Sequence, residues 1–453
     1  MLCSIGLLML NSGTTQAGQE TTRVSVKYGT ENGEPNASSS QPDISADGRY
    51  VAFDSAATDL LSTKDSQLHS DIFVRDLTNQ TTERISVKYG TAIDEPNTFS
   101  YRPAISAHGR YVAFESYATN LLSTPDLLSY TDIFVRDRTN QTTERVSVKY
   151  DTESDEPNSS SSKPAISADG SYVAFESYAT NLLSTPDSLS YTDIFIRDRL
   201  TDTTERISIS TTGGEPNGSS FRPAISADGR FVAFESSATN LLSTPDSLLN
   251  TDIFVRDRIT ATTERISIST TGGEPHGSSG YPDISADGRY VAFGSLAPDL
   301  VENDTNGLSD VFIFDRQTKM TELVSVNSNG EQQTGGDNTG YGGVLSADGR
   351  YVTFSSEATN LVDNDTGGFR DLFRRDRKKG VTIQVSVNTA GEAQNGWVYE
   401  QYSISGDGRF LAFMSQATNL VEPNDVQFNN DIFLREEEKE FFWPLFLPGK
   451  SKN

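Results

Sequence analysis

The sequence contains a single cysteine, Cys3, among its 453 residues. An intramolecular disulfide and a cysteine-ligated zinc site are therefore excluded. Histidine is almost as scarce, with 3 residues and no HExxH motif, so a histidine-based zinc site is not expected either. No apolar run approaches the roughly 20 residues that a membrane-spanning helix needs, and we expect no transmembrane segment.

Positive charge is also in short supply. The chain has 37 basic and 63 acidic residues, which gives a formal net charge of -26. Proteins that bind nucleic acids obtain most of their affinity from Lys and Arg side chains that neutralise phosphates. We therefore expect no nucleic-acid partner. The negative charge is compatible with divalent cations, with cationic partners or with solubility alone.

The N-terminal segment MLCSIGLLML is apolar and is followed by NSGTTQAGQE. Thr15 and Ala17 place small residues at the spacing that signal peptidase requires, so residues 1–17 are interpreted as a signal peptide. No Lys or Arg precedes the apolar run, which departs from the usual pattern, and the position of Cys3 argues against a lipoprotein. The interpretation predicts an exported bacterial protein that is periplasmic, attached to the cell surface or extracellular.

An internal repeat dominates the rest of the chain. Each unit contains four short strand-like segments, which in the fourth unit are PAIS, RFVAFES, TDIFVRD and TTERISI, and none has helical periodicity. The Asp-Gly dipeptide between the first two segments predicts a type I′ hairpin turn, in which both central residues have positive φ. Four strands repeated seven times predict a β-propeller. The phrase ISADGRYVAF and its variants begin, 59 or 61 residues apart, at Ile44, Ile105, Ile166, Ile225, Ile284, Leu345 and Ile404.

The chain begins with a fragment of its own repeat. The fourth-strand phrase occurs at Thr22–Val26, before the first complete unit, and the seventh unit stops after its third strand. We therefore expect Thr22–Val26 to pair beside Asp431–Arg435 and to close the ring. The predicted fold is all-β, a single seven-bladed propeller of four-stranded blades over residues 18–435. Residues 436–453 form a tail, acidic and then apolar, that either packs on the ring or serves as a sorting or docking peptide.

The phrases ISADGRYVAFES, DIFVRDR and TTERVSV together resemble the WD40-like propeller repeats of the TolB type (PD40 repeats), from about residue 22 to residue 435. The resemblance implies a propeller, and such repeats are common in exported bacterial proteins. Two features depart from the family. Ala replaces the usual Pro of the SPDG phrase, and there is no room for the α/β domain that precedes the TolB propeller. The particular partners of TolB are therefore not carried over.

The connections of a four-stranded blade alternate between the two faces of a propeller. The Asp-Gly turns and the third-to-fourth turns are short and share one face. The second-to-third loops and the links between blades are long and share the opposite face, here called the long-loop face. Long loops on a rigid scaffold are where binding sites usually lie. We therefore expect a protein or glycan ligand to bind the long-loop face.

Each second-to-third loop carries two Asp residues six positions apart. Calcium prefers carboxylate and amide oxygens, and the loops of blades five and six are the most metal-like, although neither is an EF-hand. The alternative is that the Asp residues cap loops by accepting hydrogen bonds from amides. The candidate ligands are Asp304, Asn306, Asp310, Asp363, Asp365 and Asp371. The seven pairs are Asp65/Asp71, Asp126/Asp132, Asp187/Asp193, Asp246/Asp252, Asp304/Asp310, Asp365/Asp371 and Asp425/Asp431.

Two further repeated features are interpreted as structural. The Arg residues of GRY and FVRDR are expected to pair with nearby Asp residues. The EPN phrases between blades offer carboxylate and amide groups to a sugar or peptide, but Pro-Asn is more often turn chemistry. These phrases begin at Glu34, Glu95, Glu156 and Glu215.

Catalysis is not expected. The histidines His69, His108 and His276 occupy non-equivalent positions or different blades, and no G-x-S-x-G elbow is present. The predicted function is a monomeric, non-catalytic binding or scaffold module, with calcium as a candidate stabilising ion. A carbohydrate-active enzyme, either a glycoside hydrolase or a lyase, is the alternative, and a purely structural surface repeat is the third. One deep acidic cleft with a raised carboxyl pKa would favour the enzyme, because an active site should break the symmetry of the repeats.

Overall fold

The computed structural model describes residues 19–438 except 64–67, 125–127, 129, 153–154, 186, 190, 245–247, 249, 336–341, 364, 366–367 and 423–428. The predicted signal peptide, with Cys3, and the tail beyond residue 438 lie outside the described residues. Within the described part of the chain, no helix has the length and apolar character to cross a membrane.

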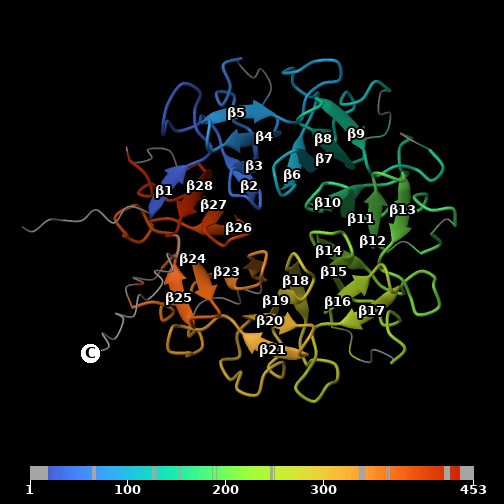
Figure 1. Cartoon of the computed structure of the whole chain (residues 1–453), viewed down its shortest axis with the longest axis vertical. Helices are drawn as coiled ribbons and strands as arrows, with labels where there is room; N and C mark the ends of the chain where they lie inside the picture. The colour runs from blue at the N-terminus through green and yellow to red at the C-terminus, as the bar shows by residue number, and fades with distance from the viewer. Residues whose placement is uncertain are drawn as a thin grey trace, which may run out of the picture.

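Seven antiparallel four-stranded sheets stand side by side in a ring (Figure 1), which confirms the predicted propeller. The strands nearest the axis are β2 (Ser39–Ile44), β6 (Ser100–Ile105), β10 (Ser161–Ile166), β14 (Ser220–Ile225), β18 (Ser279–Ile284), β22 (Val344–Leu345) and β26 (Val398–Ile404). The second strands are β3 (Tyr50–Ser55), β7 (Tyr111–Ser116), β11 (Tyr172–Ser177), β15 (Phe231–Ser236), β19 (Tyr290–Ser295), β23 (Tyr351–Ser356) and β27 (Phe410–Ser415).

The two outer positions of each blade follow the same order. The third strands are β4 (Asp71–Asp76), β8 (Asp132–Asp137), β12 (Asp193–Asp198), β16 (Asp252–Asp257), β20 (Asp310–Asp315), β24 (Asp371–Asp376) and β28 (Asp431–Glu436). The fourth strands are β5 (Thr81–Arg84), β9 (Thr142–Arg145), β13 (Thr203–Arg206), β17 (Thr262–Arg265), β21 (Met320–Leu323), β25 (Val381–Gln384) and, for the seventh blade, β1 (Glu20–Arg23).

The apolar core lies between neighbouring blades. The second and third strands are apolar on both faces because each blade is packed between two others. Phe114 of β7 and Phe134 of β8 are fully buried, and their ring centroids are 6.0 Å apart. Phe114 belongs to a cluster that also contains Ile72 and Val74 of the preceding blade. The repeated phrase YVAF therefore builds the interfaces between blades as well as the blades themselves.

The N-terminal strand closes the ring, as predicted. In β1, Thr22 lies opposite Leu434 of β28. The strand begins two residues before the predicted Thr22 and ends at Arg23, and the Val24 amide still donates to the Ile432 carbonyl at 2.7 Å. The seventh blade therefore joins the two ends of the propeller.

The Asp-Gly turn differs from the predicted type I′ turn. The Gly48 amide donates to the Ser45 carbonyl at 2.8 Å, and Gly48 has a φ of 73° whereas Asp47 is not in the positive-φ region. The turn is therefore of type I and is followed by a left-handed glycine. The physical reason is a side-chain clamp, because Asp47 Oδ1 accepts hydrogen bonds from Ser45 Oγ at 2.6 Å and from the Arg49 amide at 3.0 Å.

These turns also join the seven blades at the short-loop end of the axis. One backbone amide from each turn donates to a carbonyl of the next blade, at 2.9 to 3.2 Å. Proline has no N–H group, so the alanine that replaces the SPDG proline supplies the donor in most blades. The residues of this ring are, in order, Asp47, Ala107, Ala168, Ala227, Ala286, Ala347, Gly406 and Ala46.

On the same face, the predicted Arg–Asp pairing is confirmed for the Arg of GRY, whereas the last Arg of FVRDR pairs with a Glu. Arg49 Nη2 of the first turn lies 2.8 Å from Asp76 Oδ2 at the end of the third strand. Arg138 Nη2 contacts Glu83 of the preceding blade at 2.5 Å, and its guanidinium carbon lies 4.4 Å from the centre of the Tyr50 ring. The two kinds of Arg therefore connect strands within a blade and blades within the ring.

Candidate binding site at the mouth of the central channel

The Asp that opens each third strand is a buried structural residue. Asp132 is 2% exposed, and its Oδ1 accepts a hydrogen bond from Ser147 Oγ at 2.9 Å. Ser147 Oγ accepts in turn the amide of Ile133. The corresponding Ser–Asp bond is present in all seven blades. This Asp therefore locks the fourth strand to the third, which agrees with the structural alternative to metal binding.

A fourth-strand Arg neutralises this Asp in five blades. In blade three, Arg206 contacts both members of the Asp pair, Asp187 and Asp193. Leu323 and Gln384 occupy the Arg position in blades five and six. The five Nε–Oδ2 distances are 3.3 Å for Arg23–Asp431, 3.0 Å for Arg84–Asp71, 3.1 Å for Arg145–Asp132, 3.2 Å for Arg206–Asp193 and 3.2 Å for Arg265–Asp252.

In blade five, the predicted ligands Asp304, Asn306 and Asp310 are neighbours. Asn306 Nδ2 donates to Asp310 Oδ2 at 2.8 Å, and Gln333 Nε2 donates to Asp310 Oδ1 at 3.0 Å. Burial, with a smaller contribution from Asp304, raises the pKa of Asp310 to about 6. Asp304 Oδ1 is buried and has no hydrogen-bond partner among the described residues. In blade five, the side-chain amides of Asn306 and Gln333 therefore contact the Asp310 carboxylate, whereas the corresponding carboxylate of five other blades is paired with an Arg.

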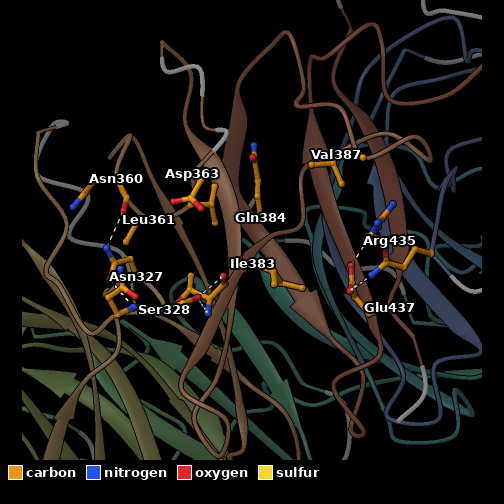
Figure 2. A pocket seen from close by; sticks show the side chains of 15 residues that line it. Asn327, Ser328, Asn360, Leu361, Asp363, Ile383, Gln384, Val387, Arg435 and Glu437 are labelled. Carbon is orange, nitrogen blue, oxygen red and sulfur yellow. Dashed lines mark hydrogen bonds and ion pairs between the residues drawn. The ribbon is translucent and has the colours of Figure 1, made fainter. Parts of the chain in front are cut away.

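In blade six, the predicted ligands Asp365 and Asp371 interact, and Asp363 lies at the surface. Gln384 Nε2 donates to Asp371 Oδ1 at 2.7 Å, but an amide does not neutralise the carboxylate. Burial, with a smaller contribution from Asp365, raises the pKa of Asp371 to about 6. Asp363 and Gln384 line a pocket of about 500 Å³ beside β25 (Figure 2). Similar grooves lie along the outer strands of blades one and four. This pocket is therefore a recurring feature of the blades and not a site specific to blade six.

The remaining candidates for a metal or catalytic site are the other Asp pairs and the three histidines. Among the described residues, no group of three or more His, Cys, Asp or Glu side chains could hold a metal ion. The first Asp of the pairs in blades one, two, four and seven lies outside the described residues. His276 Nδ1 is 2.6 Å from Asp299, His108 is exposed beside Asp47, and the ring of His69 packs on Phe99. The calcium site therefore stays a prediction.

The EPN phrases tie the long loops together, which supports their interpretation as turn chemistry. Asn36 Nδ2 donates to Thr58 Oγ1 at 2.8 Å, and the Thr58 amide donates back to Asn36 Oδ1 at 2.9 Å. The same reciprocal bonds recur in the next three blades. Glu215 accepts the amides of Ser188 and Leu189 from the preceding blade.

A cavity of about 540 Å³ lies on the propeller axis and is lined by the first strands of all seven blades. The sequence analysis missed this site, because its residues belong to the strand of the repeat that varies most. In five blades the lining contains an X-Pro step, and the Pro cannot donate to the strand ladder. A β-bulge results, and the residue before the Pro has a φ between 49° and 55°. A bulge changes the direction of the side chains beside it. These bulges lie at the long-loop end of the channel.

The residue at this position, which lies in a bulge in five blades, differs from blade to blade. Blades two, three and four carry Arg102, Lys163 and Arg222, here called the cationic arc. Blades one, five, six and seven carry Gln41, Tyr281, Gly342 and Gln401. Gln41 Oε1 and Gln401 Oε1 are buried without a hydrogen-bond partner within the described part of the chain. The mouth therefore combines donors on one side with unsatisfied acceptors on the other.

Aromatic side chains lie near the long-loop ends of the first strands in blades two, three and five. Tyr117 and Tyr178 follow the second strands of blades two and three and are 42% and 53% exposed. The ring of Tyr281 lies 4.0 Å from the guanidinium carbon of Arg222. Tyr101 precedes Arg102. The rings of Tyr101 and Phe99 are stacked, with their centroids 5.8 Å apart. Such rings offer flat apolar surfaces beside polar groups.

Two carboxylic acids lie deeper in the channel, in blades one and five. Asp43 Oδ2 accepts the amide of Ile105, and Asp283 Oδ2 accepts the amide of Leu345, both at 2.7 Å. Burial raises the pKa of Asp43 to about 7, with a further contribution from Asp283, and burial raises the pKa of Asp283 to about 6. Ala, Val or Ser stands at this position in the other blades. These acids break the repeat symmetry, as an active site would.

The raised pKa values predict how stability depends on pH. Unfolded Asp titrates near pH ~3.9, so between about pH 4 and 7 the folded protein binds more protons than the unfolded chain. Stability contributed by these two groups therefore falls as the pH rises through this window. The variants Asp43→Asn and Asp283→Asn keep a hydrogen-bond acceptor but cannot ionise. We expect them to melt at a higher temperature than the parent at pH 8, and the difference to vanish near pH 4. Thermal melts from pH 4 to 8 measure this, and a variant less stable than the parent at pH 8 contradicts it.

Comparison with known proteins finds similarity of fold. No protein-family model matches the sequence, and no curated protein sequence is significantly similar to it. A solved oligogalacturonate lyase in complex with manganese is 11% identical, with a TM-score of 0.52 over 93% of this chain and 99% of that chain. The acylaminoacyl peptidase of Pyrococcus horikoshii is 12% identical, with a TM-score of 0.51 over 89% of this chain and 52% of that chain. A putative TolB from Agrobacterium tumefaciens is 17% identical, with a TM-score of 0.38 over 68% and 87%.

These similarities correct one expectation. We expected a protein without catalytic activity, and this is contradicted, because two of the three similar structures are named as enzymes. One of them, the lyase, matches this chain over nearly its whole length, so a propeller of this extent is compatible with catalysis. The TolB-type propeller fold is supported by the seven-bladed ring, whereas no family model matches to establish the PD40 family.

Proposed function

We propose that this protein binds an oligosaccharide across the mouth of its central channel, on the long-loop face. One observation carries the proposal. The seven blades present seven equivalent positions at the channel mouth, five of them at β-bulges, and these positions carry two arginines, a lysine, two glutamines, a tyrosine and a glycine. A structural role repeated by every blade would not need this variation. We still predict that the protein is exported, and that it meets such a ligand in the periplasm, at the cell surface or outside the cell.

The chemistry of the mouth fits a sugar. The exposed rings of Tyr117 and Tyr178 can cover the C–H face of a pyranose, while arginine, lysine and amide groups hydrogen-bond to its hydroxyls. The lyase described above is named for an oligosaccharide substrate, and its fold matches 93% of this chain.

The proposal is tested with a panel of neutral and acidic oligosaccharides by isothermal titration calorimetry. The double variant Tyr117→Ala/Tyr178→Ala should weaken binding about fivefold or more, because each stacked ring contributes ~1 kcal/mol. Tyr28→Ala is the matched control, since Tyr28 is 61% exposed but lies in a groove of the perimeter. A panel without any bound member, or equal affinities for the double variant and the parent, refutes the proposal.

A carbohydrate-active enzyme is the second candidate, because Asp43 and Asp283 place two acids in the same channel with pKa values raised towards neutrality. A group that titrates near the working pH is suited to general acid–base catalysis. Incubation with the bound oligosaccharides would then release new chain ends. Asp43→Asn and Asp283→Asn should lower that rate ~100-fold or more while binding persists. Unchanged turnover in both variants excludes the pair.

We also propose that calcium rigidifies the loops of blades five and six. The supporting observation is that Leu323 and Gln384 replace the Arg that neutralises the sister Asp residues. At ~1 mM calcium, a site with a dissociation constant of ~0.1 mM contributes about 1.4 kcal/mol. Calcium should therefore raise the melting temperature over that in chelator.

The missing cation can also be supplied by the protein. Leu323→Arg with Gln384→Arg should raise stability in chelator and remove the response to calcium, whereas Leu200→Arg, at a side chain 78% exposed, should preserve the response. A parent midpoint that does not move at millimolar calcium rules out this role.

A further inference from the structure

We infer that the oligosaccharide is acidic, with carboxylates such as those of uronic acids, and that the cationic arc binds them. This inference rests on the proposed function, because it names the ligand class of the same channel mouth. It starts from the contrast between the negative charge of the whole chain and the positive side chains of the arc. In a chain with a net charge of -26, three successive blades carry cations at one narrow opening.

The three glutamates beneath the arc are fully occupied, whereas Oδ1 of Asp54, the corresponding acid of blade one, is buried without a hydrogen-bond partner among the described residues. Glu115 Oε1 accepts from Arg102 Nη1, and its Oε2 accepts the amide of Lys163 in the next blade at 3.1 Å. Glu176 and Glu235 likewise accept the next blade's amides, those of Arg222 and Tyr281, at 2.9 Å. These acids therefore hold the arc in place and leave no carboxylate oxygen to receive a ligand.

The cations lie above these acids and are the more exposed partners. The side chains of Arg102, Lys163 and Arg222 are 45%, 30% and 33% exposed, and the side chains of their Glu partners are 4% to 8% exposed. Arg102 uses Nη1 on Glu115, and a guanidinium has five N–H donors. A ligand at the mouth thus meets N–H donors that the Glu partners leave unused, on cations that are more exposed than the carboxylates paired with them. Charge-assisted bonds to carboxylates are the strongest that such donors make.

Lys163 is the centre of the arc. Burial lowers its pKa, and Arg102 and Arg222 on the two adjacent blades lower it further, while Glu176 acts in the opposite direction. A neighbouring carboxylate would stabilise the charged form of this lysine. A bound anion would therefore raise the pKa of Lys163 back towards its usual value.

A sugar fits the mouth better than an acidic peptide. The unsatisfied oxygens of Gln41 and Gln401 need donors. A uronic acid carries hydroxyl donors and a carboxylate on one ring, so it can meet both sides of the mouth together. The ionised side chains of an acidic peptide carry no donor, so a peptide would have to supply these donors from its backbone N–H groups, away from its carboxylates.

The experiment compares oligogalacturonate with its methyl ester, which has the same shape without the charge. We expect the free acid to bind the parent protein roughly tenfold or more tightly than the ester, and the difference to shrink as salt is added. Lys163→Met should remove most of that difference and weaken ester binding much less than binding of the free acid, and Lys163→Arg should restore the difference. Lys149→Met, at an exposed lysine of an inter-blade link, is the matched control. Melting curves show that each variant is folded.

The outcomes separate the two proposals. Equal binding of acid and ester, or an unchanged preference in Lys163→Met, overturns the acidic class and leaves oligosaccharide binding intact. If neither ligand binds and no other oligosaccharide does, the proposed function itself fails. Binding of polyglutamate, lost in Lys163→Met, without binding of oligogalacturonate would assign the arc to acidic peptides and overturn both.

Discussion

Deletion of residues 1–26 is expected to prevent the ring from closing and to abolish cooperative unfolding at the melting temperature of the full chain. The deletion removes β1, and with it Val24 and Val26, which are 0% and 2% exposed. Burial of each valine contributes about 1.5–3 kcal/mol. It also removes Arg23, whose Nε lies 3.3 Å from Asp431 Oδ2 in a fully buried pair. An unpaired buried charge costs about 3–5 kcal/mol.

The contributions of the two valines and of the buried ion pair together are comparable to the whole free energy of unfolding of an ordinary domain, about 5–15 kcal/mol. Circular dichroism melts and size-exclusion chromatography measure the effect. The matched control is deletion of residues 1–18, which keeps every residue of β1 and should melt close to the full chain. If the two deletions melt at the same temperature, the N-terminal strand does not close the propeller.

Arg145→Leu is expected to lower the free energy of unfolding by about 3–5 kcal/mol. The side chains of Arg145 and Asp132 are 3% and 2% exposed, so the substitution leaves the Asp132 carboxylate without its nearest cation. Leucine itself is accommodated at this position, because Leu323 occupies it in blade five. The loss should therefore come from charge and not from shape.

Urea denaturation measures this loss, and a second substitution tests its cause. Asp132→Asn in the Arg145→Leu background should recover part of the stability, because the uncompensated charge is then gone. Arg110→Leu in the same blade is the control, since the Arg110 side chain is 46% exposed and its charge reaches solvent. Equal losses for Arg145→Leu and Arg110→Leu would show that burial does not govern these ion pairs.

The recurring Asp pairs show how far sequence comparison within the chain could reach. Alignment of the seven loops identified both members of each pair and singled out blades five and six. It did not identify the Arg on the fourth strand as the cation that distinguishes them, because Arg265 follows Asp252 by 13 positions and no local pattern links the two. The pairing of β16 with β17 brings them to 3.2 Å.

The channel mouth was missed for a related reason. Arg102, Lys163 and Arg222 are about 60 residues apart, and in sequence each is an ordinary polar residue before a proline. Only the ring arranges them around one axis. Asp43 and Asp283 are 240 residues apart, yet Asp283 contributes to the raised pKa of Asp43.

The sequence by itself determined the strand order, the number of blades and the closing strand, because these follow from local alternation of apolar residues and from repetition. It also indicated which face carries the long loops. The turn type follows from a local side-chain clamp of Asp47. The neutralisation of the buried acids and the composition of the channel were decided by the tertiary structure, because they depend on contacts across strands and blades. There a hydrogen bond from a residue 46 to 406 positions away sets the environment of a side chain.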